Sequence, residues 1–143
     1  MKTQLTTRIF LFLFSFVMFT NCTKKDDITP ANIADRIAGN YTITLIAANG
    51  QSLKLPYNQG GEQLNGTIVI SKVSATAILF TYNLASVIGG VKNQKSDSGN
   101  FDIKQNGNII ELYEDNSSVK VGALSGTVLT IDSGGTKINA NKN

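Results

Sequence analysis

Histidine and tryptophan are missing from this 143-residue chain, and cysteine occurs once. Without histidine the protein has neither the usual general base nor the commonest transition-metal ligand, so Ser-His-Asp and Cys-His mechanisms are excluded. One cysteine cannot close an internal disulfide or build a thiolate metal site. The sequence therefore predicts a protein that is not an enzyme, with no catalytic residues, no metal and no other cofactor.

Charged residues are scarce, at 16% of the chain, and nearly balanced between thirteen basic and ten acidic side chains. Lys2 and Arg8 lie in the N-terminal leader, so residues 22–143 carry eleven basic side chains against ten acidic ones. The lysines are scattered and form no stripe that would neutralise a phosphate backbone. We expect no nucleic-acid partner.

Asp102 and Glu111 are the carboxylates that come nearest to a catalytic pair, because they fall on neighbouring strands of a predicted hairpin. A glycosidase needs two carboxylates held a fixed distance apart across a bound sugar. The apolar neighbours of both residues predict that both side chains point to solvent. We expect no catalytic pair here.

Long apolar runs are also absent, except for one at residues 9–19, which follows Lys2 and Arg8. A helix of that length reaches about 16 Å, whereas the hydrocarbon core of a bilayer is about 30 Å thick. A charged start before a short apolar core is typical of a secretory signal peptide. We expect residues 1–21 to be such a peptide and to be cleaved; an uncleaved membrane anchor is the alternative.

Cys22 lies three residues after the apolar run, and Phe19-Thr20-Asn21-Cys22 resembles the lipobox of bacterial lipoproteins. Thr20 fits that pattern, whereas Phe19 and Asn21 replace its common aliphatic and small residues. The resemblance implies that Cys22 carries a lipid, including palmitate-type acyl chains. Two acyl chains hold a protein stably on a membrane, whereas one holds it only marginally. The alternative is an ordinary signal peptide followed by a free cysteine.

The polar residues 22–31 read as a tether, and Thr23-Lys24-Lys25-Asp26-Asp27 begins it. This run resembles the export signal of Bacteroidota-type surface lipoproteins. The resemblance implies an outer-membrane protein that is lipid-anchored and faces the cell surface. A plain solvated tether is the alternative.

A short helix is predicted to open the folded domain over residues 32–143. Thr29 suits the N-cap and Pro30 the first helical position, while Ile33 and Ile37 share one face. Gly39 is predicted to end the helix.

From Gly39 onward the hydrophobic period changes to two, which is typical of half-buried strands. Asn49-Gly50 and Asn106-Gly107 are hairpin signals, because both residue types tolerate positive φ. Residues 57–61 and 86–99 read as loops, the second with a weak strand at Val87-Ile88 as its alternative. Strands begin about every 8 to 12 residues, as in an antiparallel barrel or sandwich.

Gly39-Asn40-Tyr41, after a short helix, resembles the Gly-x-Trp opening of lipocalins, with Tyr41 in place of the tryptophan. Residues 99–112 and 124–131 are similar to the closing meander of bacterial lipocalin-like lipoprotein domains. The resemblance implies an all-β fold: a small antiparallel meander barrel of about eight short strands with an N-terminal helix. It implies a fold more than an activity.

Two functions remain open on the sequence. The first is a non-enzymatic binding module that holds a small apolar ligand inside the barrel, with Tyr41, Phe80 and Tyr82 as the interior contacts. The second is a structural lipoprotein that docks on another envelope protein and takes no small molecule. In the second case the aromatic side chains are core. A cavity of at least ~300 Å³ would favour the first, and a packed interior with an exposed apolar patch the second.

Overall fold

The computed structural model describes residues 33–143. The predicted leader, Cys22, the predicted tether, and Thr29 and Pro30, which were predicted to begin the helix, lie outside these residues. The described part has one helix and ten strands. In chain order they are α2 (Ile33–Ile37), β1 (Gly39–Ala48), β2 (Gln51–Lys54), β3 (Tyr57–Gln59), β4 (Glu62–Lys72), β5 (Ala77–Ile88), β6 (Val91–Asn106), β7 (Ile109–Glu114), β8 (Lys120–Ser125), β9 (Val128–Ser133) and β10 (Thr136–Lys142).

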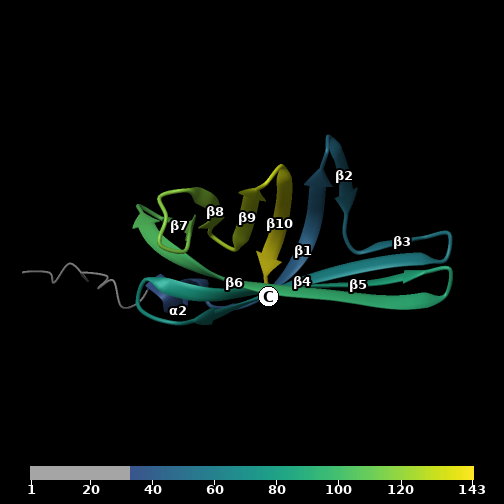
Figure 1. Ribbon diagram of the computed structural model, residues 1–143, viewed down its shortest axis with the longest axis horizontal. Helices are drawn as coiled ribbons and strands as arrows, with labels where there is room; N and C mark the ends of the chain where they lie inside the picture. Colours follow the sequence, from purple (N-terminus) through teal and green to yellow (C-terminus); the bar gives the residue numbers. More distant parts are fainter. Residues whose placement is uncertain (1–32) are drawn as a thin grey trace, which may run out of the picture.

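Eight of these strands close into an antiparallel barrel. From β4 to β10 each strand pairs with the next, and β1 pairs with both β10 and β4, which completes the ring. β2 and β3 add to the flanks of β1 and β4 outside the ring. Figure 1 shows β7 to β10 and β1 standing over β4, β5 and β6. The predicted fold class, an antiparallel all-β barrel with a short helix, is confirmed.

Both predicted hairpins are present. β1 turns into β2 through Asn49 and Gly50, whose φ angles are 53° and 76°. β6 turns into β7 through residues 107–108, where Gly107 has a φ of 59°. Asn and Gly adopt these left-handed conformations at low cost. In the second hairpin only Gly107 does so, because Asn106 is the last residue of β6 and pairs with Ile109.

The prediction of a long loop over residues 86–99 is wrong. Residues up to Ile88 belong to β5, and β6 runs from Val91 through the rest of the segment. Gly89 and Gly90, with φ angles of 57° and 81°, make a two-residue turn between them. The first part of β6 was not predicted because its side chains are mostly polar on both faces. This part of the sheet projects beyond the barrel, so neither of its faces is deeply buried.

Residues 57–61 were also predicted as a loop, but Tyr57–Gln59 form β3 and turn through Gly60 and Gly61 into β4. β3 pairs along only three residues, too few to produce a visible alternation. The helix ends at Ile37, and Gly39 is the first residue of β1.

The core lies inside the barrel and under α2. Ile33 and Ile37 of the helix are buried, as the shared face predicts. Side chains from all eight barrel strands join them. Those below 2% exposure include Tyr41, Ile43, Ile68, Ile78, Ile103, Ile110, Leu112, Leu129 and Ala140. Asp35 of the helix forms an exposed ion pair with Lys72 at 2.8 Å, which we expect to add little stability.

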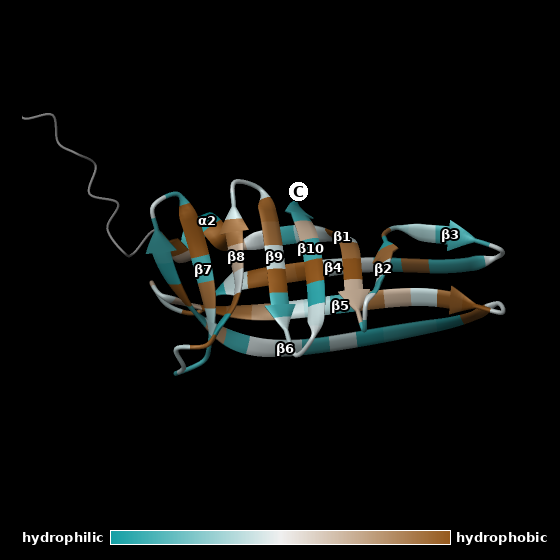
Figure 2. Cartoon of the chain, turned by 90° about the horizontal axis from the view of Figure 1, so that it is seen from above, coloured by the Kyte–Doolittle hydropathy of each residue, from teal (hydrophilic) through white to brown (hydrophobic). Residues whose placement is uncertain are grey.

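Beyond the barrel, β4, β5 and β6 continue together with β3. We call this part the protruding sheet: β3 with residues 62–67, 83–88 and 91–96. Figure 1 shows it extending away from the upright strands. Figure 2 shows that β6 is hydrophilic along most of its length, in contrast to β7 and β8.

Candidate functional site

Tyr41, the first sequence-predicted ligand contact, is completely buried near α2. Its hydroxyl donates a hydrogen bond to the Ile37 carbonyl at 2.5 Å. Ile37 is the last residue of the helix, where carbonyls lack partners within the helix, so the phenol satisfies one of them. Burial raises the pKa of Tyr41 to about 12. This side chain fastens the helix to the barrel.

Phe80 and Tyr82, the other two predicted contacts, follow each other on the same face of β5. Phe80 is 7% exposed and makes an edge-to-face contact with Phe101, with ring centroids 5.5 Å apart. Tyr82 is half-buried and lies in one cross-strand row with Ile68 and Tyr41. The structure thus places all three residues on the inner side of the barrel, where they pack against neighbouring core residues.

The barrel interior is crowded where it meets the protruding sheet. A Cβ on Gly66 would lie 2.7 Å from Ile43 Cδ1 and 3.0 Å from Leu84 Cδ2, distances that require a side chain to move. Glycine is therefore the residue that fits between β1 and β5 here. Such close packing leaves little space beside Tyr82 for a second molecule.

A hollow instead lies across the outer face of β4, β5 and β6. It has a volume of about 270 Å³. Because Ile68 and Phe80 point into the barrel, residues at odd positions of β4 and β5 point outward. The outward side chains that line the hollow are Asn65, Thr67, Asn83, Ala85, Gln94 and Ser96. We call the five polar ones, all except Ala85, the polar row residues.

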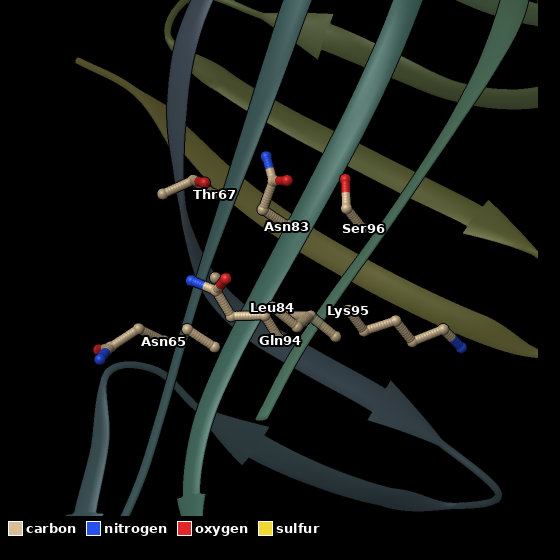
Figure 3. A pocket seen from close by; sticks show the side chains of 9 residues that line it. Asn65, Thr67, Asn83, Leu84, Gln94, Lys95 and Ser96 are labelled. Atoms are coloured by element: carbon tan, nitrogen blue, oxygen red, sulfur yellow. The ribbon is translucent and has the colours of Figure 1, made fainter. Parts of the chain in front are cut away.

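Register explains how the polar row residues come together. Thr67, Asn83 and Ser96 lie side by side on three adjacent strands, and Asn65, Ala85 and Gln94 form the next row. Figure 3 shows the two rows, with Asn83 beside Ser96 and Asn65 and Gln94 below them. Ala85 has a short side chain, so the centre of the second row is lower than its rims. The hollow follows from this difference in side-chain length.

A second hollow, of about 390 Å³, continues the first toward the β5–β6 turn. Gln63, Val87 and Lys92 form the third row here, and Gln94 and Asn65 line both hollows. The combined surface offers amides and hydroxyls beside the apolar residues Leu84, Ala85 and Val87, and Lys92 and Lys95 are the charged residues that line it. An amide group both donates and accepts hydrogen bonds, and so does a hydroxyl.

Two further hollows lie elsewhere on the barrel: about 340 Å³ beside β8 and β9, around Gly122 and Thr130, and about 250 Å³ between Arg36 and the ends of β7 and β8. Tyr41, Phe80 and Tyr82 line none of these four hollows.

Asp102 and Glu111 lie on adjacent strands but are engaged separately. Asp102 accepts the Asn116 amide at 3.1 Å, at the turn after β7. Glu111 accepts hydrogen bonds from Lys120 at 2.5 Å and from the Tyr113 hydroxyl at 2.9 Å. The hydrogen bond from Lys120 holds the pKa of Glu111 below its ordinary value, and Tyr113 lowers it further. Within residues 33–143 we find no group of three or more acidic, cysteine or histidine side chains placed to hold a metal.

The polar row residues were missed at the level of sequence. Asn83 and Thr67 look like the ordinary solvent side of alternating strands, and Gln94 and Ser96 fall in the segment that reads as a loop. A signal was available in Gly89-Gly90 flanked by Ile88 and Val91, which is a hairpin pattern.

The fold thus defines an eight-stranded antiparallel barrel with a short helix and a protruding sheet. Searches of protein-family models, curated proteins and solved structures found no match to this chain. The one helix in the described part of the chain, α2, lacks the length and apolarity needed to cross a membrane.

Proposed function

We propose that this chain is a lipid-anchored lipoprotein of the bacterial outer membrane, held at the cell surface, whose barrel is a non-enzymatic binding module for an uncharged, hydroxyl-rich chain such as a neutral glycan. The observation that carries the proposal is the pair of hollows on the outer face of β4, β5 and β6, which amide and hydroxyl side chains line together with a few apolar ones. The barrel itself serves as the rigid support for that face.

The packing of the interior argues against the barrel as a container for a small apolar ligand. Tyr41, Ile68 and Ile78 have no exposed surface, and Phe80 is in contact with Phe101. Protein interiors packed in this way leave few voids larger than a water molecule. An apolar ligand would have to displace side chains that already fill the space.

The chemistry of the outer face favours a neutral partner rich in hydroxyl groups. Asn65, Asn83 and Gln94 can each donate to one hydroxyl and accept from another. Thr67 and Ser96 add hydroxyl groups of their own in the same rows. A polyanion would need a cluster of cations, whereas Lys92 and Lys95 are the two that line the hollows.

The lipid anchor rests on Cys22 and the polar tether, as the resemblance to lipoproteins implies. The resemblance of Thr23-Lys24-Lys25-Asp26-Asp27 to the export signal of Bacteroidota-type surface lipoproteins supports export to the outer face. A surface position agrees with a glycan partner, because envelope glycans are exposed there.

Affinity electrophoresis of the full chain in mild detergent tests the binding site. We expect the protein to be retarded in gels that contain at least one neutral polysaccharide from a panel of dextran, mannan and β-glucan. Asn83→Ala should reduce the retardation, whereas Asn141→Ala, an equally simple change at an exposed site on β10, should leave it unchanged. Equal behaviour of the two variants, or retardation only by anionic polymers and only at low salt, would contradict the proposal.

Palmitate labelling tests the anchor independently. Cells that express the full chain should incorporate labelled palmitate into it, and Cys22→Ser should abolish the label and release the protein from membranes. Globomycin should cause the uncleaved form to accumulate. Normal membrane retention of Cys22→Ser would contradict the anchor but leave the binding site untested, so the two parts can fail separately.

Docking on an envelope protein is a second candidate function, favoured by the apolar tip of the β5–β6 hairpin. Ile88 and Val91 flank the turn and are 55% and 60% exposed. Isolated exposed apolar residues are common, but these two lie together at the end of the protruding sheet. A photo-crosslinking residue at position 88 should capture a partner protein if this candidate is right, whereas one at position 109 on β7 should not.

A further inference from the structure

β6 has a long free edge. β5 pairs with β6 from Val91 to Asp102, but β7 joins the other side only from Phe101 onward. Over residues 91–100, no strand among residues 33–143 occupies that other side. In Figure 2 this stretch of β6 borders the sheet with no strand beyond it. Ten residues at 3.4 Å each make an edge of about 34 Å.

The turn between β5 and β6 determines which backbone groups face outward from this edge. Ile88 and Val91 flank a two-residue loop and therefore form a hydrogen-bonded pair, after which hydrogen-bonded and non-hydrogen-bonded pairs alternate. The amides and carbonyls of Lys92, Gln94, Ser96, Ser98 and Asn100 then point to the free edge. The Ser98 amide accordingly donates to the side chain of its neighbour, Asp97, at 2.9 Å.

We propose that the free edge of β6 pairs with the same edge of a second copy of this chain, antiparallel and with Ser96 on the two-fold axis. An axis perpendicular to the sheet keeps each face on its own side, so a residue must oppose one of the same parity. With Ser96 opposite its own copy, Gln94 pairs with the second copy's Ser98 and Lys92 with its Asn100. All of these residues have outward-facing backbone groups.

Charge selects this register over its neighbours. With Ser96 on the axis, Lys95 lies directly opposite the second copy's Asp97, and by symmetry the pair occurs twice. Moving the axis to Lys95 or to Asp97 would instead place two like charges opposite each other, which destabilises a cross-strand pair. Lysines on an edge strand discourage pairing with arbitrary strands. Here Lys95 lies opposite an aspartate when the pairing strand is β6 of a second copy.

The geometry of the neighbouring elements sets the length of the pairing. It covers residues 92–100 of both copies and stops at Phe101, where β7 takes over the edge. The Ser98 amide gains a backbone carbonyl in place of the Asp97 side chain. That exchange frees the carboxylate for Lys95 of the second copy. On the outer face, the row Thr67–Asn83–Ser96 continues into its symmetric counterpart, so the polar face doubles in width.

Disulfide trapping in cells tests the register. Cα atoms of a hydrogen-bonded antiparallel pair lie about 5.5 Å apart, within the range that a disulfide spans. The full chain with Ser96→Cys should therefore form a covalent dimer under mild oxidation. Gln94→Cys and Ser98→Cys should each remain monomeric alone, because each residue lies about 13 Å along the strand from its own copy. The two variants expressed together should cross-link, and the wild-type chain controls for Cys22.

Charge reversal tests the pairing without cysteine. Asp97→Lys, and separately Lys95→Asp, should each weaken dimerisation roughly tenfold, and the double variant should restore it. Sedimentation of the full chain in mild detergent measures the effect, and both residues are exposed, so folding should be unaffected. A monomeric Ser96→Cys, cross-linking of Gln94→Cys or Ser98→Cys alone to the same extent, or a double variant that stays as weak as the singles would overturn the proposal.

Discussion

The barrel and the protruding sheet share three strands, β4, β5 and β6, and yet these strands differ in burial and polarity between the two regions. Inside the barrel, β4 and β5 alternate strictly: Ile68, Ile70 and Ile78 are buried, and the residues between them face outward. Beyond the barrel this alternation is lost: residues 83–87 of β5 are all half-buried, and the outward positions of β4 there, Gln63, Asn65 and Thr67, are polar and exposed. β6 changes even more sharply, because its first eight residues are all exposed.

This difference indicates that the two regions have different roles. Closure of the barrel removes strand edges and buries enough apolar surface to hold the fold. The protruding sheet contributes few core residues, so its outer face and its β6 edge are free to be selected for recognition. We infer that stability depends on the barrel and binding on the sheet.

The largest expected effect contrasts one core residue with one surface residue. Leu112→Ala removes a completely buried side chain from β7 and should lower the free energy of unfolding by about 2–5 kcal/mol. Val91→Ala, at 60% exposure in the protruding sheet, should change it by no more than about 0.5 kcal/mol. Urea unfolding followed by circular dichroism measures both. Similar costs for the two would erase the proposed difference between the regions.

Two glycines sharpen the comparison at the level of the backbone. A Cβ on Gly122 in β8 would lie 2.5 Å from the Thr130 carbonyl oxygen, so Gly122→Ala should destabilise the barrel by about 1–3 kcal/mol. Gly99→Ala is the matched control on the β6 edge, since its nearest atom outside its chain neighbours lies 3.6 Å away. We expect little change there, and thermal unfolding of both variants would reveal any reversal of the order.

Tyr41 links the helix to the barrel and gives the barrel a specific pH dependence. Tyr41→Phe should cost about 0.5–1.5 kcal/mol at neutral pH, because the Ile37 carbonyl loses its donor. The pKa of Tyr41 rises from 10.0 to about 12 on folding, so the phenol favours the folded state below pH 10 and this contribution is lost as pH rises toward 12. In unfolding curves from pH 9 upward the stability advantage of wild type over the variant should shrink, and it should reverse by pH 12, because two pKa units correspond to about 2.7 kcal/mol. A constant gap would contradict the role given to burial.

The smallest expected effect is at Glu111, on the outside of the barrel. Lys120 and Tyr113 lower the pKa of this carboxyl on folding, so it stabilises the fold above its ordinary 4.5 and loses that contribution as pH falls further. Glu111→Gln should therefore be slightly less stable than wild type at pH 7 and equally stable in strong acid. A variant that is as stable as wild type at pH 7, or more stable, would show that the Lys120 contact does not stabilise the fold.

Most of the barrel could be predicted from the sequence, but little of the candidate site could. Strands such as Tyr41–Leu45 and Ile78–Leu84 are legible because one face meets the core, and Asn49-Gly50 and Gly107 mark turns that require positive φ. β6 could not be predicted over residues 91–99, because a strand with solvent on both faces has no alternation of apolar and polar residues. The polar hollow depends on the register between β4, β5 and β6, which pairs residues far apart in the chain. No local pattern encodes that register.

Tyr41, Phe80 and Tyr82 illustrate the same limit. The alternation correctly places them on the inner side of their strands. Whether such side chains line a cavity or fill it depends on what approaches from the opposite strands and from α2. That information exists only in the assembled barrel.

Native mass spectrometry of the protein released from its own envelope tests the central claim most directly. A lipid-anchored chain with a filled barrel should appear with the mass of the acyl chains on Cys22 and without any apolar small molecule bound in stoichiometric amount. An unmodified Cys22, or a stoichiometric apolar ligand that survives release and is lost on unfolding, would contradict the account.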